Sequence, residues 1–269
     1  MAASPEGAAA VPVPAGRPAV SARRTFEIVR ELGVTDFRLK YNDSVLGYAW
    51  SMLSPLAMLG IYYFVFRHIL GERSGGYEIY LLVGVVFWSF FQDCTFSGLN
   101  ALSVRAGVLR AIHVPVLLVV AAGGLSTVIT ICINTGVLVL ALLVLGQLSP
   151  LFPLVVIPLV CLILFGLGIS LLTALAWVRF RDVGLLWNVV LQAWFWMTPV
   201  VYTVRNPAFE EVLYLNPVAR CLYLIRWFLV YRYMPSPRFL AITVLVCVGF
   251  FLLALRLFRR YESRIPEEL

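Results

Sequence analysis

A run of 65 consecutive residues, 114–178, contains no Asp, Glu, Lys or Arg, and it constrains this chain more than any other feature. About 20 apolar residues cross the hydrocarbon core of a bilayer as a helix, so the run is long enough for two crossings. The sequence Gly-Gln-Leu-Ser-Pro at 146–150 interrupts it with residues that favour turns. We therefore predict two membrane helices joined by a tight turn.

The whole chain has the composition of a membrane protein. It is 61% apolar and 13% charged, whereas soluble domains carry about 25% charged residues, and its mean hydropathy is +0.92. These values exclude a cytosolic enzyme, a secreted disulfide scaffold and an intrinsically disordered protein. The charge-free intervals predict an all-α integral membrane protein with six transmembrane helices, near 45–68, 79–102, 115–145, 153–178, 184–203 and 238–258.

The distribution of basic residues predicts the orientation. Basic residues accumulate on cytoplasmic loops, and with the amino terminus inside, 14 of the 21 Lys and Arg residues fall on the cytoplasmic side. An even number of spans then places both termini in the cytoplasm. The main exception is a group of five arginines between the last two spans.

Three polar segments are predicted outside the spans. Residues 1–20 are rich in Ala and Pro and are interpreted as a disordered cytoplasmic extension. Residues 21–43 are expected to form an interfacial amphipathic helix and a connector, because apolar side chains recur every three or four positions between charged ones. A solvated helix of a small cytoplasmic cap is the alternative. The transmembrane domain is then 44–260, followed by a cytoplasmic tail at 261–269.

The sequence contains none of the motifs that bind nucleotide phosphates, ligate zinc or carry a catalytic serine. Its two histidines, His68 and His113, lie far apart at the ends of predicted spans, where an interfacial position explains them. We therefore expect no catalytic residue, no metal site and no cofactor bound by this chain, which is not an enzyme by itself. Any directional work needs energy from another protein.

The segment before the last span is rich in aromatic residues, because 185–239 holds 13 of the chain's 37. Its part from 213 to 230 is apolar but interrupted by Arg220 and Arg226, which predicts a re-entrant or interfacial helical segment on the outer side. Aromatic rings stack on sugar rings, which suits a channel for a glycan; an ordinary aromatic belt at the membrane interface is the alternative. The candidate channel aromatics are Trp194, Trp196, Tyr202 and Tyr223.

Asp93 is the one charged residue between 79 and 104. A carboxylate inside a membrane helix is a functional candidate by default. A buried acid that is hydrogen-bonded or protonated is an equally good interpretation, and we assign Asp93 no role from the sequence.

The stretch 36–55, DFRLKYNDSVLGYAWSMLSP, resembles the signature that leads into the first span of ABC-2 type permeases. Two shorter stretches agree, at 178–183 and at Asn216-Pro217 with Tyr223 and Arg226. The resemblance covers about residues 21–260 and is to the group that exports bacterial polysaccharides such as O-antigen, teichoic acid, capsule and galactan. The fixed positions of the signature are met by Asp36, Phe37, Arg38, Lys40, Tyr41, Ser44, Leu46, Gly47, Trp50 and Pro55.

The resemblance implies roles for two groups of residues. One forms a gate at which an anionic, lipid-linked substrate enters: Arg38, Lys40, Tyr41, Gly47, Trp50 and Pro55. The other lies on two short inside loops, 103–113 and 179–183, and couples the chain to an ATPase: Arg105, Arg110, Arg179, Arg181 and Asp182. By residue type alone, lipid anchoring or a helix kink explains the first group equally well. The second group is explained by basic residues that only orient the chain in the membrane, together with a helix cap at Asp182.

The resemblance further implies the permease subunit of an ATP-driven ABC exporter in the bacterial plasma (inner) membrane. It would work as a homodimer with two nucleotide-binding ATPase subunits, which hold the ATP and Mg. The substrate would be a lipid-linked polysaccharide or another cell-envelope glycolipid moved outward from the cytoplasmic side, with no nucleic acid involved. Two alternatives stay open: an ABC-2 permease for a drug or small lipid, and a membrane enzyme or assembly factor without an ATPase partner.

Overall fold

The computed structural model describes residues 22–42, 47–69, 71, 76–111, 115–144, 146–204 and 206–262. This described part of the chain is helical and contains no strand. The predicted extension 1–20 and most of the predicted tail, 263–269, lie outside the described residues. The elements are α1 (Ala22–Asn42), η1 (Gly47–Ala49), α2 (Trp50–Tyr63), η2 (Phe64–Ile69), α3 (Tyr77–Ala111), α4 (Val116–Val144), η3 (Phe152–Val155), α5 (Val156–Arg179), α6 (Val183–Trp196), α7 (Pro207–Leu213), α8 (Pro217–Arg226), η4 (Trp227–Tyr231) and α9 (Pro237–Tyr261).

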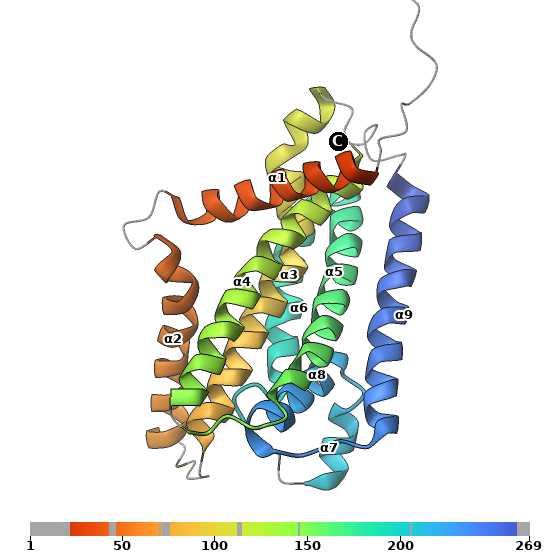
Figure 1. Ribbon diagram of the computed structural model, residues 1–269. Helices are drawn as coiled ribbons and strands as arrows, with labels where there is room; N and C mark the ends of the chain where they lie inside the picture. Colours follow the sequence, from red (N-terminus) through yellow and green to blue (C-terminus); the bar gives the residue numbers. More distant parts are fainter. Residues whose placement is uncertain are drawn as a thin grey trace, which may run out of the picture.

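Among the described residues, four helices are long and apolar enough to cross a membrane. They stand side by side in Figure 1, where α3 packs on α4 and α5, and α5 packs on α9. The prediction of an all-helical membrane protein is confirmed. The four helices are Tyr77–Ser103, Val116–Val144, Phe152–Arg179 and Pro237–Tyr261, close to four of the predicted spans.

The first and fifth predicted spans are shorter helices. The apolar part of the first is Leu56–Ile69, and the fifth, α6, ends at Trp196 although the charge-free run continues to 204. At about 1.5 Å per residue, the 14 residues of α6 reach about 21 Å, against a hydrocarbon core of about 30 Å. The helix stops because Pro199 disfavours helical backbone in the residue before it and offers no N–H. The fifth helix therefore ends well before the predicted bound near 203, and the count of six crossings stays a prediction.

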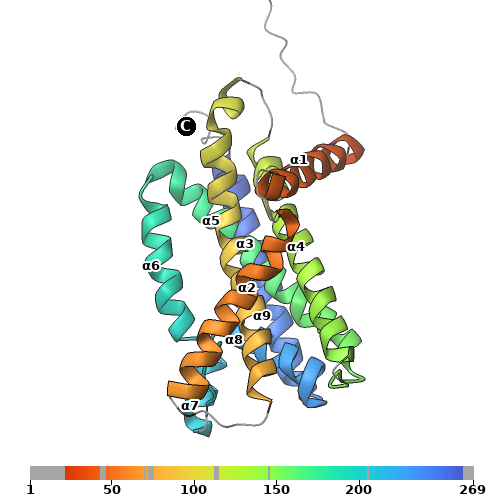
Figure 2. The ribbon, with the colours of Figure 1, turned by 90° about the vertical axis from the view of Figure 1, so that its left-hand side faces the viewer.

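The elements gather at two ends of the helical bundle. Figure 1 shows α1 lying across one end, the end at which α9 also finishes, and α7 and α8 at the other; Figure 2 places the turn between α5 and α6 at the α1 end as well. α3 also ends there, and it stays helical to Ala111, where the sequence predicts a loop at 103–113. The four pieces predicted to face the cytoplasm therefore share one end. We call it the α1 end, and the opposite one the α8 end.

α1 crosses α4 at close range near Gly33. A Cβ added at Gly33 would lie 2.9 Å from the carbonyl oxygen of Ala122 and equally close to the side chain of Leu125, so a larger residue would push the two helices apart. α1 runs to Asn42 and takes in most of the predicted connector. The chain turns toward α2 at Gly47, whose φ is +49°, a left-handed conformation that favours glycine.

The predicted outer segment forms the short helices α7 and α8. Each begins at an Asn-Pro pair: the side chains of Asn206 and Asn216 accept hydrogen bonds from the N–H groups of Ala208 and Val218, both at 3.0 Å. Asn is a favoured N-cap and Pro a favoured first helical residue, so the local sequence sets both starts. α8 is buried from Val218 to Arg226, which makes this helix part of the core.

Candidate functional site

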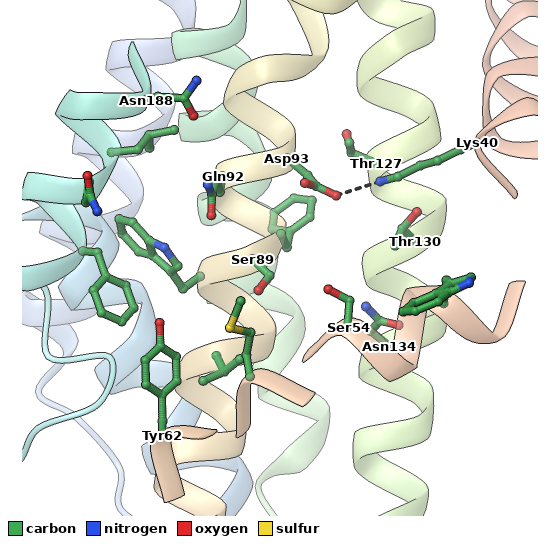
Figure 3. A pocket seen from close by; sticks show the side chains of 18 of the residues that line it. Lys40, Ser54, Tyr62, Ser89, Gln92, Asp93, Thr127, Thr130, Asn134 and Asn188 are labelled. Carbon is green, nitrogen blue, oxygen red and sulfur yellow. Dashed lines mark hydrogen bonds and ion pairs between the residues drawn. The ribbon is translucent and has the colours of Figure 1, made fainter. Parts of the chain in front are cut away.

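A cavity of about 790 Å³ lies between α2, α3, α4 and α6, beside the end of α1. Ligand pockets in proteins have volumes of about 300–1,000 Å³, so it can hold a small molecule or a short part of a longer chain. Figure 3 shows side chains from several helices around the shared space. The polar ones are Lys40, Ser54, Ser89, Gln92, Asp93, Thr127, Thr130, Asn134, Asn188 and Gln192, and the aromatic ones are Trp50, Tyr62, Trp88, Phe90, Phe195 and Trp196.

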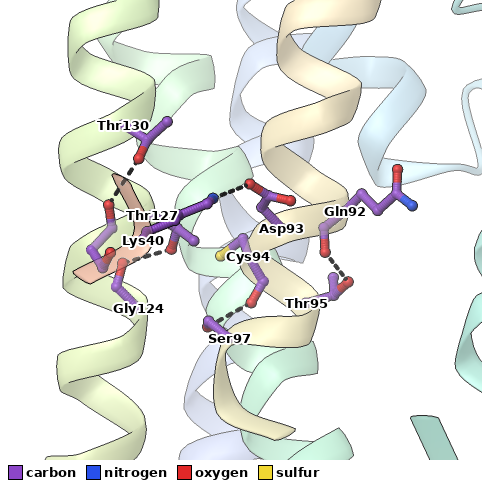
Figure 4. Close-up of polar contacts among 10 residues, drawn as sticks. Lys40, Gln92, Asp93, Cys94, Thr95, Ser97, Gly124, Thr127 and Thr130 are labelled. Atoms are coloured by element: carbon purple, nitrogen blue, oxygen red, sulfur yellow. Dashed lines mark hydrogen bonds and ion pairs between the residues drawn. The ribbon is translucent and has the colours of Figure 1, made fainter. Parts of the chain in front are cut away.

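The lining is polar but mostly uncharged. Eight of the ten polar residues carry hydroxyl or amide groups, which both donate and accept hydrogen bonds. Thr127 and Thr130 donate to the carbonyl oxygens of Gly124 and Ser126 in their own helix, at 2.7 and 3.1 Å, so their hydroxyl oxygens can still accept (Figure 4). The aromatic rings add flat apolar faces. Such a lining suits a ligand that offers many hydroxyl groups and ring faces.

One ion pair crosses this lining. The Nζ atom of Lys40, near the end of α1, donates to Oδ2 of Asp93 on α3 at 2.7 Å, as Figures 3 and 4 show. The two side chains are 41% and 51% exposed. They are the only charged residues among the described residues that line the cavity. The pair joins the helix that lies across the α1 end to the core of the bundle.

The predicted gate residues are partly brought together. Lys40 and Trp50 line the cavity, and Gly47 forms the turn between α1 and α2. Arg38 is exposed on α1 and does not contribute to the lining. Outside the described part of the structure lie the side chains of Tyr41 and Pro55.

The four candidate channel aromatics take different positions. Trp196 lines the cavity and is 58% exposed. Trp194 turns toward the core, where its indole N–H donates to Oδ1 of Asn216 at 3.1 Å. Tyr223 is buried in α8, and the hydroxyl of Tyr202 donates to the backbone carbonyl of Trp196 at 2.9 Å. Of the four, Trp196 is therefore the one whose side chain reaches the cavity.

The predicted coupling residues lie at the α1 end. Arg179 ends α5, and Arg181 and Asp182 form an exposed turn before α6. Asp182 occupies the N-cap position, but its side chain makes no capping hydrogen bond; its backbone carbonyl accepts from the N–H of Leu185 instead. The side-chain cap considered for Asp182 is thus absent, and the carboxylate stays at the surface. The side chains of Arg105 and Arg110, on the last turns of α3, are outside the described part.

Comparison with known proteins places this arrangement in a family. The family model described as ABC-2 type transporter matches residues 29–230, which is most of the chain and includes every residue that lines the cavity. The chain belongs to the ABC-2 type transporter family. The resemblance based on the stretch 36–55 is thus confirmed.

Three relatives carry the same name in two organisms. The chain is 24% identical over 257 residues to the O-antigen export system permease protein RfbA of Klebsiella pneumoniae, with 91% of this chain and 95% of that protein covered. A second Klebsiella pneumoniae protein of this name is 24% identical over 198 residues, covering 72% of this chain and 76% of the relative. The Myxococcus xanthus protein of this name is 27% identical over 192 residues, covering 68% and 72%.

A second polar cluster in this ABC-2 type transporter holds irregular backbone at the α8 end. Arg226 is 1% exposed, and its guanidinium donates to the carbonyl oxygens of Pro199 at 2.7 Å and Val200 at 3.0 Å. The hydroxyl of Tyr80 donates to the carbonyls of Pro199 and Tyr202 at 3.0 and 2.8 Å. Backbone that leaves a helix in apolar surroundings must find hydrogen-bond partners within the protein. Arg226 and Tyr80 supply them for the stretch that follows α6.

Arg220 ties α8 to the start of α9 in a similar way. Its Nε donates to the hydroxyl of Thr243 at 2.9 Å, and its terminal nitrogen donates to the carbonyl of Phe239 at 2.8 Å. The guanidinium also lies 3.9 Å from the ring centre of Phe239. The sequence indicates Arg220 and Arg226 as charges on the outer side, and the structure identifies them as buried donors that join helices.

Proposed function

We propose that this chain is the membrane-spanning permease subunit of an ATP-driven ABC exporter that moves a lipid-linked polysaccharide or a cell-envelope glycolipid outward from the cytoplasmic side. The observation that carries the proposal is the cavity lined by hydroxyls, amides and aromatic rings beside α1. The relatives support it, because all three are named as O-antigen export permeases.

The chemistry of the cavity matches a sugar chain that slides through a protein. Amide groups such as those of Asn188 and Gln192 bond to hydroxyls of any sugar, since they both donate and accept. The ring of Trp196 offers an apolar face to a sugar ring without selecting its substituents. Recognition of this kind holds each sugar weakly, and successive sugars can replace one another.

We propose that the exporter contains two copies of this chain and two ATPase subunits. α2 and α6 border the cavity, and both carry apolar side chains that are exposed in the single chain, among them Leu56 at 44%, Leu185 at 72% and Val189 at 66%. A second copy against these faces would bury them and turn the cavity into an enclosed passage. ATP and Mg would bind to the partner subunits, since this sequence carries no phosphate-binding motif.

We propose six crossings of the bacterial inner membrane with both termini in the cytoplasm. The excess of basic residues on the predicted inside supports this orientation. The sharing of one end by α1, the end of α3, the α5–α6 turn and the end of α9 supports it too.

Replacing Gln192 by Leu tests the transport role of the cavity. We expect export to fall about tenfold or more, because an apolar side chain removes a hydrogen-bonding group where the glycan passes and a tenfold change corresponds to about 1.4 kcal/mol. The measurement is the amount of glycolipid that reaches the outer surface and the amount retained inside, with variant and wild type present in the membrane at equal amounts. The matched control is Gln147→Leu, the same change in an exposed loop away from the cavity.

The control variant should export normally. Normal export by Gln192→Leu would contradict the transport role of the cavity. Export of a small lipid or drug in place of a glycan would favour the alternative ABC-2 substrate.

Asp182→Ala tests the proposed contact with the ATPase. We expect the amount of ATPase that co-purifies with the chain to fall about tenfold, because a surface carboxylate in a charge-assisted hydrogen bond with a partner contributes about 1.5–3 kcal/mol. Arg179→Lys and Arg181→Lys should weaken docking less, since they keep the charge and lose only the planar fork. The control is Glu211→Ala, an exposed carboxylate at the α8 end.

Insertion and stability of these variants should equal those of the wild type. If all three coupling variants recover as much ATPase as the wild type, the 179–183 turn only orients the chain in the membrane and does not bind the ATPase. ATP binding by the purified chain alone would contradict the need for a partner.

A further inference from the structure

Lys40 is the only lysine of a chain that has 20 arginines, and it forms an ion pair with Asp93 at the cavity. Arginine binds a carboxylate with a planar fork of two hydrogen bonds, whereas the lysine ammonium is a compact charge that can change partners without a fixed geometry. Both side chains are about half exposed to the cavity. Ion pairs with this exposure are weak, so another anion in the cavity can compete for the ammonium.

The charges of the lining decide what kind of ligand could compete. With Lys40 and Asp93 paired, the part of the lining that the structure describes has no net charge, and its other polar residues are neutral. A neutral ligand offers no charge that could replace the carboxylate of Asp93 in the pair. A phosphate group can replace it, because it offers more negative charge than a carboxylate and several acceptor oxygens to the same ammonium.

We propose that the carboxylate of Asp93 occupies the position of a ligand phosphate. It pairs with Lys40 until the phosphate of an incoming lipid-linked ligand replaces it in the ion pair. The inference rests on the proposed function and adds a role for Asp93, which neutralises the charge of Lys40 until a phosphate-bearing ligand replaces it. No covalent bond changes in this exchange; one ion pair replaces another.

The exchange also changes a contact between helices. Lys40 lies near the end of α1, and α1 packs on α4 near Gly33. Release of Asp93 therefore removes one contact between the Lys40 end of α1 and α3 while the packing at Gly33 remains. This end of α1 leads directly into the turn at Gly47 and α2, which borders the cavity.

Binding of a defined probe tests the exchange. We would measure a polyprenyl diphosphate against the corresponding polyprenol with the full chain in phosphatidylcholine nanodiscs, following tryptophan fluorescence, since Trp50, Trp88 and Trp196 line the cavity. Asp93→Asn should bind the diphosphate about fivefold more tightly, because it removes a competitor worth up to about fivefold. Lys40→Gln should bind it about tenfold or more weakly, and neither change should affect the polyprenol. Inorganic pyrophosphate tests whether a free anion binds equally well. Phosphatidylglycerol tests the same for the head group of an ordinary lipid, in place of a prenyl-linked diphosphate.

Amine labelling gives a second measurement that does not depend on variants. Because Lys40 is the only lysine, its modification by an amine-reactive reagent can be read directly by mass spectrometry of its peptide. The diphosphate probe should lower the labelling rate of Lys40 in the wild type, and more strongly in Asp93→Asn. Labelling that is unaffected by the probe would overturn the proposal even if a variant fails to fold.

The pattern of affinities separates the exchange from a structural ion pair. If Asp93→Asn weakens binding as Lys40→Gln does, the pair only holds α1 in place and the proposal is wrong. Equal affinity in all three proteins would also overturn it. Either result leaves glycan export by the wild type intact, so failure of the exchange is distinct from failure of the proposed function.

Discussion

Arg226→Met is expected to destabilise the α8 end by about 3 kcal/mol or more, since a hydrogen bond from a charged group contributes about 1.5–3 kcal/mol and the guanidinium makes several. The side chain is 1% exposed and donates to the carbonyls of Pro199, Val200 and Tyr80. Methionine fills a similar volume and donates nothing, so the irregular backbone after α6 loses donors that water cannot replace. The measurement is the thermal unfolding midpoint of the purified protein in detergent.

Two variants make this result specific. Arg238→Met removes an exposed arginine from the start of α9 and should leave the midpoint nearly unchanged. Arg226→Lys keeps the charge, but one ammonium cannot reach all three carbonyls, so its midpoint should lie between those of Arg226→Met and the wild type. Wild-type stability of Arg226→Met would mean that the carbonyls have other donors.

Trp194→Ala and Trp196→Ala are expected to impair different properties, stability and export respectively, although the residues are two positions apart. Trp194 packs edge-on against Phe91, with ring centres 5.3 Å apart, and bonds to Asn216. Because Trp194 is half-buried, its loss should cost about 3 kcal/mol of stability, the low end of the range for aromatic residues replaced by alanine in protein cores. Trp196 is 58% exposed in the cavity, so its loss should change stability by about 0.5 kcal/mol or less and lower export.

Both quantities have to be measured on each variant: the unfolding midpoint, and export per folded molecule. Normal export by stable Trp196→Ala protein would show that the ring is part of an ordinary aromatic belt. A stable Trp194→Ala variant with reduced export would instead restore Trp194 to the predicted channel lining.

The long helices could be predicted because their physical requirement is written in the sequence. A span needs an uninterrupted run of apolar residues, and the break in the 65-residue run falls at Gly146, whose φ is +67°. The early end of α6 could not be predicted from the same rule. The run stays apolar beyond Trp196, and what ends the helix is backbone geometry at Pro199 together with donors on Arg226 and Tyr80, which come from other parts of the chain.

Single residues of the candidate site could be predicted from the sequence, but the contacts between them could not. The signature stretch selected Lys40 and Trp50, which do line the cavity. It could not pair Lys40 with Asp93, because the two lie 53 positions apart and meet through the packing of α1 across the bundle. Composition could not separate Trp194 from Trp196 either. Two steps along a helix turn a side chain by about 200°, so one ring enters the core and the other the cavity.

The length of α3 has a mechanical consequence. Its 35 residues form a rod of about 52 Å at about 1.5 Å each, and Tyr77 anchors one end by its hydrogen bond to the carbonyl of Val201. Asp93 lies slightly less than halfway along. If the rod pivots at Tyr77, a push of about 4 Å at Ala111 moves Asp93 by about 2 Å, which is enough to separate it from Lys40. The helix is then a lever that halves the displacement delivered at its tip and doubles the force at the ion pair.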